Sequence, residues 1–258
     1  MHCHLLPLKN NQVINLRTLQ VTSSQGEFDS NSDLEFNQFS DFSNVESYFR
    51  NMFDDDEEIQ YLQMLLGYCI TGELETDMKN IILFIGDGKG KTTICILLSK
   101  ILDNLCQRLP SRYFTSKILY KNFGIHMSEI VDKRLCFSEL DDINKLNIGL
   151  LKGLVSKENF IARKLYQNPM LVILSSKYIF ESNTMLNCTD CGFLRRIQII
   201  PFTKKLSHNN TNMNLNELFS WICIGANNYY RNKNFKIPES FTNYIYSNTN
   251  IKTNTVTI

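Results

Sequence analysis

The sequence predicts an α/β protein with a mostly parallel sheet, preceded by a small helical region. Two observations support this prediction. Between residues 79 and 205, apolar runs typical of strands alternate with segments of helical periodicity, as in strands joined by crossover helices. One such run, 81–85, breaks into the glycine-rich segment 86–93, and a helical pattern follows over 91–103. Strand, glycine turn and helix in this order indicate a phosphate-binding loop.

Length and composition fit one α/β domain with additions. The 258 residues carry a net charge of +1, and 43% of them are hydrophobic, which is enough for a sizeable core. No apolar run reaches the roughly 18 to 20 residues that a membrane span needs, and the N-terminus lacks the pattern of a secretion signal. We therefore expect an intracellular protein that has no membrane partner.

The patterns along the chain change three times and predict four parts. These parts are an N-terminal extension with short strands (1–44), a helical region (45–78), the α/β core (79–205) and a C-terminal helix with a polar tail (206–258). Core strands are expected near 81–85, 133–138, 170–175 and 196–201. Helices are expected at 91–103, 143–155 and 216–230. The acidic run 54–58 should begin a helix, because acidic side chains complement the positive end of the helix dipole.

The glycine-rich segment has the residues that hold a nucleoside triphosphate. It consists of Gly86, Asp87, Gly88, Lys89, Gly90, Lys91, Thr92 and Thr93. Glycines allow several backbone N–H groups to face one anion, Lys91 is expected to reach the outer phosphates, and the Thr92 hydroxyl to bind Mg²⁺. Counted from Gly86, the loop is one residue shorter than the usual spacing. ATP and Mg²⁺ are therefore the expected cofactors.

Two further segments could complete a site for phosphoryl transfer. The apolar run 134–138 ends in Glu139, whose carboxylate could hold the water shell of Mg²⁺ and orient or deprotonate the attacking water. Arg195 and Arg196 directly precede another apolar run, where one of them could project into a neighbouring subunit and stabilise the γ-phosphate. Taken alone, these features are also compatible with an acidic turn and an ordinary pair of arginines. A trans-acting arginine would require an oligomer.

Blocks in a fixed order along most of the chain extend this interpretation. They are LLPLKNNQVINLRT, YLQMLLGYCITGEL, RLCFSELDD, GLLKGLVSKENFIARKLYQNP, TDCGFLRRIQIIPF, ELFSWICIGANNYYRN and KIPESF. With them the sequence resembles the helicase part of poxvirus-type primase-helicases, members of the superfamily 3 helicases found in large DNA viruses and phages. The resemblance implies a P-loop NTPase fold of AAA+-like type and a hexameric ATPase ring that moves along single-stranded DNA during viral or mobile-element replication.

The resemblance also implies roles for individual residues. Lys91 and Thr92 would contact phosphate and Mg²⁺, Glu139 would be the second acid, and Arg195 or Arg196 would be the trans-acting arginine. Four residues of the segment 152–166 would face the DNA, where they could hold phosphates or stack on bases: Lys157, Arg163, Lys164 and Tyr166. A viral protein of this kind would act in the host cytoplasm or at a viral replication site. Any primase would be a separate partner, and the chain would be a small protein of its own or a truncated gene copy.

Several departures from the family pattern favour an alternative function. The strand expected at 170–175 is followed by serines and Lys177, where the family has an asparagine that senses the γ-phosphate. The segment 156–158 replaces a Gly-Gly-Asp turn, and the phosphate loop is short. The alternative is a relative that binds nucleotide or nucleic acid, or assembles, without turnover. A remote alternative is an ATP-using enzyme similar to corrinoid adenosyltransferases, whose phosphate loop, Gly-Asn-Gly-Lys-Gly-Lys-Thr-Thr, resembles this one.

Overall fold

The structure is a computed structural model with two compact units, each formed by several stretches of the chain. It describes residues 3–26, 32–75, 79–88, 90–115, 127–164, 166–204, 213–232 and 236–248. The first unit contains Met1–Glu73, Gly88–Asn104 and Phe202–Pro238. The second unit contains Leu74–Asp87, Leu105–Pro201 and Glu239–Ile258. The chain passes from the second unit to the first between Asp87 and Gly88, within the predicted phosphate loop. Gly86 and Asp87 therefore belong to the second unit, and the rest of the loop belongs to the first.

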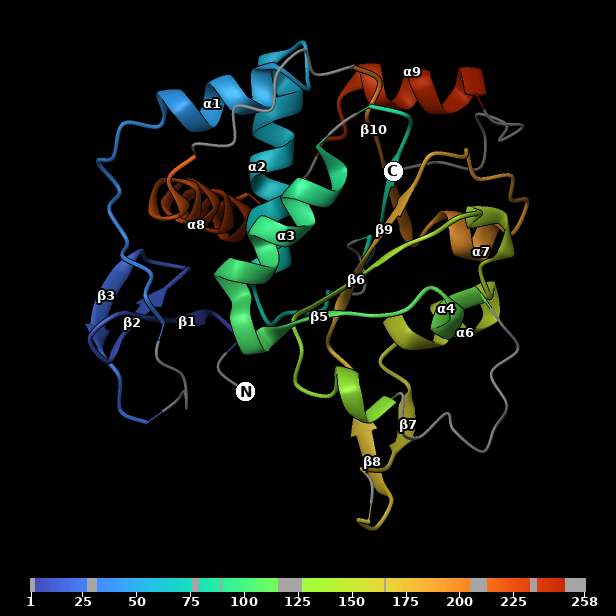
Figure 1. Ribbon diagram of the computed structural model, residues 1–258, viewed down its shortest axis with the longest axis horizontal. Helices are drawn as coiled ribbons and strands as arrows, with labels where there is room; N and C mark the ends of the chain where they lie inside the picture. The colour runs from blue at the N-terminus through green and yellow to red at the C-terminus, as the bar shows by residue number, and fades with distance from the viewer. Residues whose placement is uncertain are drawn as a thin grey trace. The chain divides into compact units, whose positions relative to one another are not determined.

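A five-stranded parallel sheet forms the centre of the second unit (Figure 1). Its strands, in spatial order, are β10 (Ile197–Pro201), β4 (Ile81–Ile85), β9 (Lys177–Ser182), β6 (Leu135–Glu139) and β5 (Cys106–Arg108). All five residues of β4 are buried, as expected for a central parallel strand that is covered on both faces. The predicted α/β class with a mostly parallel sheet is confirmed, and the fold resembles that of P-loop NTPases.

Short helices and one hairpin complete the second unit. The helices are α4 (Arg112–Thr115), the 3-10 helix η2 (Ile143–Lys145), α6 (Ile148–Val155), α7 (Cys191–Leu194) and α9 (Glu239–Asn248). The predicted helix at 143–155 is therefore split, because Asn147 caps α6 by accepting a hydrogen bond from the N–H of Leu150. The antiparallel hairpin consists of β7 (Asn159–Ala162) and β8 (Met170–Ile173).

The strand predicted at 170–175 is not part of the five-stranded sheet, so that expectation was wrong. Among the described residues, β8 pairs with β7, and three of its four residues are exposed. The sheet strand is β9, in which all six residues are buried. The run Met170–Ile173 is wholly apolar and imitates a core strand, whereas β9 begins with a lysine and contains Glu181, which obscured it in the sequence.

The first unit combines helices with a small antiparallel sheet. The sheet has the order β1 (Leu5–Leu8), β2 (Gln12–Asn15) and β3 (Gln20–Ser23). The helices are α1 (Ser43–Arg50), α2 (Asp56–Ile70), α3 (Lys91–Leu102), followed along the chain by η1 (Asp103–Leu105), and α8 (Leu215–Arg231). Asp55 and Glu58 form a capping box at the start of α2, so the acidic run does begin a helix as predicted.

Helices α2 and α8 lie side by side in the first unit (Figure 1). Their close approach depends on two glycines. A Cβ atom at Gly67 would lie 2.1 Å from the backbone N of Ala226, and one at Gly225 would lie 2.1 Å from the carbonyl O of Gln63. In the described part of the chain, no helix has both the length and the apolar character needed to cross a membrane.

Candidate functional site

The first half of the phosphate loop leaves the sheet of the second unit at Gly86. This residue follows β4 directly and has a φ of 119°, a conformation that favours glycine. Its N–H donates to the carbonyl O of Ser182 in the neighbouring strand β9, at 3.1 Å. The loop therefore starts while its backbone is still tied to the sheet, and the exposed Asp87 follows.

The second half of the loop lies in the first unit and leads into α3. The N–H of Gly88 donates to the carbonyl O of Phe202 at 2.9 Å, and a Cβ atom at Gly88 would lie 2.4 Å from that same oxygen. Gly90, with a φ of 110°, is the N-cap residue of α3. The backbone here is glycine-dependent and leads into a helix N-terminus, which suits an anion.

Lys91 lies against the loop. Its side chain is buried, and the ammonium donates to the carbonyl O of Gly88 at 3.0 Å. The same nitrogen lies 6.0 Å from the centre of the Phe202 ring. Thr92 and Thr93, in the first turn of α3, are half-buried. The predicted phosphate-contacting lysine is thus held on the loop backbone, whereas Lys89 lies outside the described residues.

Two carboxylates lie at the carboxyl edge of the parallel sheet, the edge at which Gly86 emerges. Glu139 ends β6 and is paired in register with Glu181 of β9, which is paired with Phe84 of β4. The Glu139 side chain is 61% exposed, and its Oε2 lies 3.4 Å from Nη2 of Arg108. Glu181 is only 2% exposed. Glu139 therefore lies at the end of its strand, at the same edge of the sheet as Gly86.

Asn183 is a candidate that the sequence analysis missed. It directly follows β9, the strand between β4 and β6, and so lies at the same edge as Glu139. The family resemblance implied an asparagine after the sheet strand, and Lys177 was expected in its place. That expectation was wrong, because Lys177 begins β9 and the strand ends at Ser182. In the sequence, the polar triplet Ser182-Asn183-Thr184 follows a short apolar run, and this pattern could have indicated the end of a strand.

Arg195 and Arg196 lie at the opposite, amino edge of the sheet. They follow α7 and precede β10, and the carbonyl O of Arg196 accepts a hydrogen bond from the N–H of Ile81, the first residue of β4. A five-residue strand separates them from the carboxyl edge, which corresponds to about 16 Å. The structure therefore does not bring these arginines together with Glu139 in one copy of the second unit.

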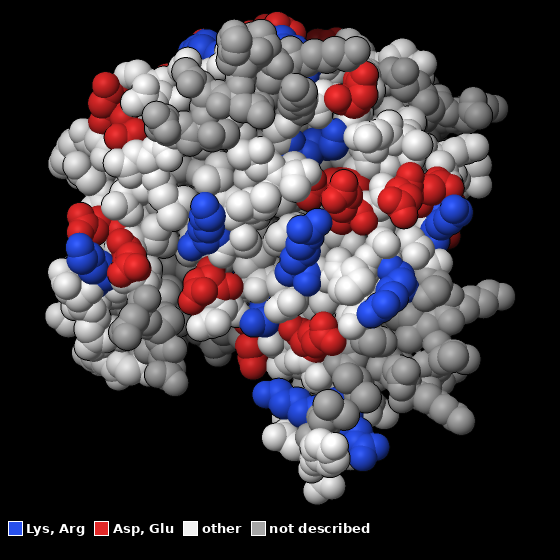
Figure 2. Space-filling view, viewed as in Figure 1, with Lys and Arg blue, Asp and Glu red and all other residues white. Residues whose placement is uncertain are grey.

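The predicted DNA contacts lie on or beside the hairpin β7–β8. Lys157 precedes β7 with a φ of 55°, and Arg163 and Lys164 follow it. The hairpin turn contains Tyr166, which is fully exposed, and the guanidinium Nε of Arg163 donates to the carbonyl O of Gln167 at 3.3 Å. Basic side chains are visible on this hairpin in the lower part of Figure 2. The structure thus places these predicted contacts on one element.

The two faces of this hairpin differ. Phe160 and Val172 are directly opposite each other and pack against the core of the second unit. On the other face, Ile161 is paired with Leu171, and both are exposed, as is Ile173. One face of the hairpin therefore anchors it, while the other presents apolar side chains beside the basic ones.

Comparison with known proteins shows the fold of this chain. No protein-family model and no curated protein matches it. The chain is similar to the A-form apo structure of the NrS-1 C-terminal region, with a TM-score of 0.55 and 13% identity over 85% of this chain and 53% of that chain. Another apo structure of the NrS-1 C-terminal region has a TM-score of 0.52 and 15% identity, with the same coverages of 85% and 53%. The chain thus spans about half the length of these solved chains, and at this identity the likeness shows a shared fold.

Proposed function

We propose that the chain is an ATP-dependent DNA helicase of the superfamily 3 type, acting in viral or mobile-element DNA replication. The observation that carries this proposal is the carboxyl edge of the parallel sheet. There the glycine-rich loop leaves β4 at Gly86, while Glu139 and Asn183 end the next strands of the same sheet. Ligands of open α/β sheets bind outside the carboxyl ends of the strands. The fold shared with the NrS-1 C-terminal region supports the architecture of this proposal.

In the proposed reaction, the loop residues bind ATP and Glu139 acts on the attacking water. Position 88 must be glycine because a side chain there would meet the Phe202 carbonyl, so the loop backbone is packed closely against the chain that follows β10. Lys91 and the N–H groups of the loop would hold the phosphates, and Thr92 and, through water, Glu139 would hold Mg²⁺. Mg²⁺, when bound, neutralises charge on the outer phosphates. Asn183 contacts the γ-phosphate from the end of β9.

In this proposal the chain forms a homo-hexameric ring, in which a neighbouring copy supplies the positive charge for the γ-phosphate. Arg195 and Arg196 lie a strand length away from the carboxyl edge of their own sheet, so they act at the edge of the next copy. Arg195 is the exposed member of the pair, whereas Arg196 is half-buried. In a ring, each copy offers its loop to one neighbour and its arginine to the other, which is a heterologous interface that closes.

Single-stranded DNA is the proposed polymer substrate, and the β7–β8 hairpin its contact. Arg163, Lys164 and Lys157 can neutralise phosphates, and the exposed ring of Tyr166 can stack on a base. A separate primase is a possible partner of such a helicase. The chain would act in the host cytoplasm or at a viral replication site.

The alternative of a relative without turnover loses one of its three reasons and keeps the other two, which are the short loop and the replaced turn at 156–158. The phosphate loop is still one residue short, since β4 ends at Ile85 and α3 begins at Lys91. The missing asparagine is no longer a reason, because Asn183 stands at the end of the sheet strand. Hydrolysis is therefore the quantity to measure.

The deciding experiment measures ATP hydrolysis by the purified chain with and without single-stranded DNA. We expect hydrolysis to be stimulated by the DNA, and Lys91→Ala to lower it by about 10²- to 10³-fold, because the transition state loses a positive charge. Lys100→Ala, an exposed lysine near the end of the same helix, is the matched control and should retain activity. Nucleotide binding without turnover in the unmodified chain would instead support the alternative.

A further inference from the structure

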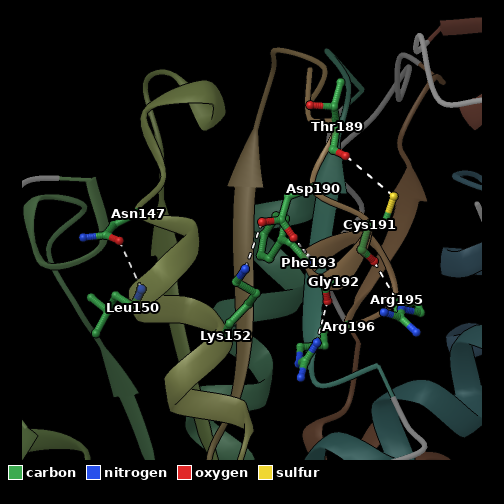
Figure 3. Close-up of polar contacts among 10 residues, drawn as sticks. All are labelled: Asn147, Leu150, Lys152, Thr189, Asp190, Cys191, Gly192, Phe193, Arg195 and Arg196. Carbon is green, nitrogen blue, oxygen red and sulfur yellow. Dashed lines mark hydrogen bonds and ion pairs between the residues drawn. The ribbon is translucent and has the colours of Figure 1, made fainter.

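One carboxylate joins helices α6 and α7 in the second unit (Figure 3). Lys152 lies in the last turn of α6, and its Nζ is 2.9 Å from Oδ2 of Asp190. The other oxygen of Asp190, Oδ1, accepts a hydrogen bond from the N–H of Phe193 at 2.7 Å and so caps α7. The two oxygens of Asp190 therefore serve two different elements of the fold.

The helix that Asp190 caps also holds both arginines. The carbonyl O of Cys191 accepts a hydrogen bond from Nε of Arg195 at 3.4 Å, and that of Gly192 accepts one from Nη1 of Arg196 at 2.6 Å. Figure 3 shows the two guanidinium groups directed back to this short turn. The orientation of α7 therefore sets the positions from which the side chains of Arg195 and Arg196 extend.

Beyond Lys152, the C-terminal end of α6 leads into the hairpin that carries the proposed DNA contacts. The hydroxyl of Ser156, which follows α6, donates to the carbonyl O of Lys152. Lys157, with a φ of 55°, then turns the chain into β7. Lys152 is thus bonded through its backbone to Ser156, the C-cap of α6 before the hairpin, and through its side chain to Asp190 at the start of the arginine-bearing turn.

An ordinary surface ion pair is the simpler interpretation of Lys152 and Asp190. Their side chains are 33% and 36% exposed, and ion pairs at such exposure usually contribute little to stability. The capping bond distinguishes this pair, because a change in the position of Asp190 also changes the start of α7. The hydrogen bonds from Lys152 and from the backbone of Phe193 lower the pKa of Asp190.

We propose that Lys152 and Asp190 are positioning residues that couple the β7–β8 hairpin to Arg195 and Arg196. A shift of the hairpin when it binds single-stranded DNA moves the end of α6, and the Lys152–Asp190 contact passes this movement to α7 and its arginines. DNA binding thereby changes hydrolysis in the neighbouring copy. This inference rests on the proposed function and names how that function is regulated.

The test measures, on the full chain, both the stimulation of ATP hydrolysis by single-stranded DNA and the Kd for that DNA. Lys152→Met keeps the apolar stem, and Asp190→Asn keeps an acceptor for the Phe193 N–H. We expect each to lower the stimulation by about 2- to 30-fold, while the Kd stays within about twofold because the DNA contacts remain. The double variant should fall no further than either single one, and Lys152→Arg should retain the stimulation.

A matched control is offered by the neighbouring pair Lys145 and Asp142, whose Nζ and Oδ2 lie 3.8 Å apart. Lys145→Met removes an ion pair of the same unit without touching α7, and it should leave the stimulation unchanged. Full stimulation in both Lys152→Met and Asp190→Asn would overturn the inference and leave the proposed function standing. Loss of DNA affinity in Lys152→Met in parallel with the stimulation would also overturn it, because Lys152 would then be a DNA contact.

Absence of hydrolysis in the unmodified chain would contradict the proposed function instead. Amide hydrogen exchange of the segment 189–197, with and without single-stranded DNA, then tests the coupling on its own. A DNA-dependent change in exchange that is lost in Lys152→Met would support the coupling. An unmodified chain whose exchange in this segment does not respond to DNA would overturn it.

Discussion

The two edges of the parallel sheet in the second unit differ in which of the predicted catalytic side chains they carry. At the carboxyl edge, β6 ends in Glu139, and β9 contains Glu181 in register with it and is followed by Asn183. At the amino edge, Lys177 begins β9 and Arg196 precedes β10. The carboxyl edge also carries Arg108, which ends β5 and pairs with Glu139. In the proposed function, a site that uses both Glu139 and Arg195 needs two copies of the chain, because a strand length separates the two residues.

The cations of the amino edge are not equivalent. Arg134, before β6, and Lys177 are fully buried, so they cannot reach a neighbouring copy. Burial also lowers the pKa of Lys79, which lies before β4. Arg195 is exposed, so among these residues it is the one placed to act outside its own copy.

Removing the exposed arginine should produce the largest effect. We expect Arg195→Ala to lower ATP hydrolysis by about 10³- to 10⁵-fold, because the developing charge on the γ-phosphate loses its partner from the next copy. Steady-state hydrolysis with single-stranded DNA is the measurement. Arg112→Ala, an exposed arginine of α4, is the control and should retain activity. Equal rates for Arg195→Ala and the unmodified chain would remove the functional contrast between the edges.

Mixing two inactive variants tests whether the edges of different copies meet. Glu139→Gln alone should lower hydrolysis by about 10²- to 10⁴-fold, because it lacks the carboxylate that activates water. In an equal mixture with Arg195→Ala, random assembly leaves about one quarter of the contacts between copies with both residues intact. Hydrolysis should therefore return to about that fraction. A mixture as inactive as its components, under conditions where subunits exchange, would show that the two residues do not share a site.

A variant at Asn183 tests the carboxyl edge of the sheet separately from the arginines. We expect Asn183→Ala to lower hydrolysis by about 10²- to 10³-fold, because a polar contact to the γ-phosphate is lost. ATP binding, measured with a fluorescent analogue, should change little. Asn187→Ala, an exposed asparagine shortly after it in the chain, is the control. Unchanged hydrolysis in Asn183→Ala would show that the end of β9 takes no part in the reaction.

The smallest expected effect is a pH-dependent change in stability, caused by Asp190 at the start of α7. Lys152 and the Phe193 N–H lower the pKa of Asp190 below its usual 3.8, so the ionised carboxylate stabilises the fold above that pH. This stabilisation is lost as the pH falls through the lowered pKa. We expect Asp190→Asn to unfold at slightly lower urea than the unmodified chain at pH 7, and the difference to shrink at low pH. A difference of the same size below the lowered pKa would contradict this assignment.

Most of the elements that meet at the carboxyl edge of the sheet could be predicted from local sequence patterns. The apolar run of β4, the glycines after it and the periodicity of α3 are consecutive in the chain, and so is the strand that ends in Glu139. Asn183 could not be placed in this way. Whether Met170–Ile173 or Lys177–Ser182 joins the sheet depends on pairing with distant strands, and the more apolar segment was the wrong one.

The sequence by itself determined the α/β class, the glycine-rich loop between a strand and a helix, and the acid at the end of β6, because short-range periodicity and glycine chemistry specify each of them. Only the tertiary structure decided which strand lies between β4 and β6, that the arginines lie at the edge opposite Glu139, and that Asp190 joins Lys152 to α7. These features depend on strand order and on contacts between segments far apart in the chain. Local patterns do not record them, because a residue's neighbours in space are set by how the whole sheet assembles.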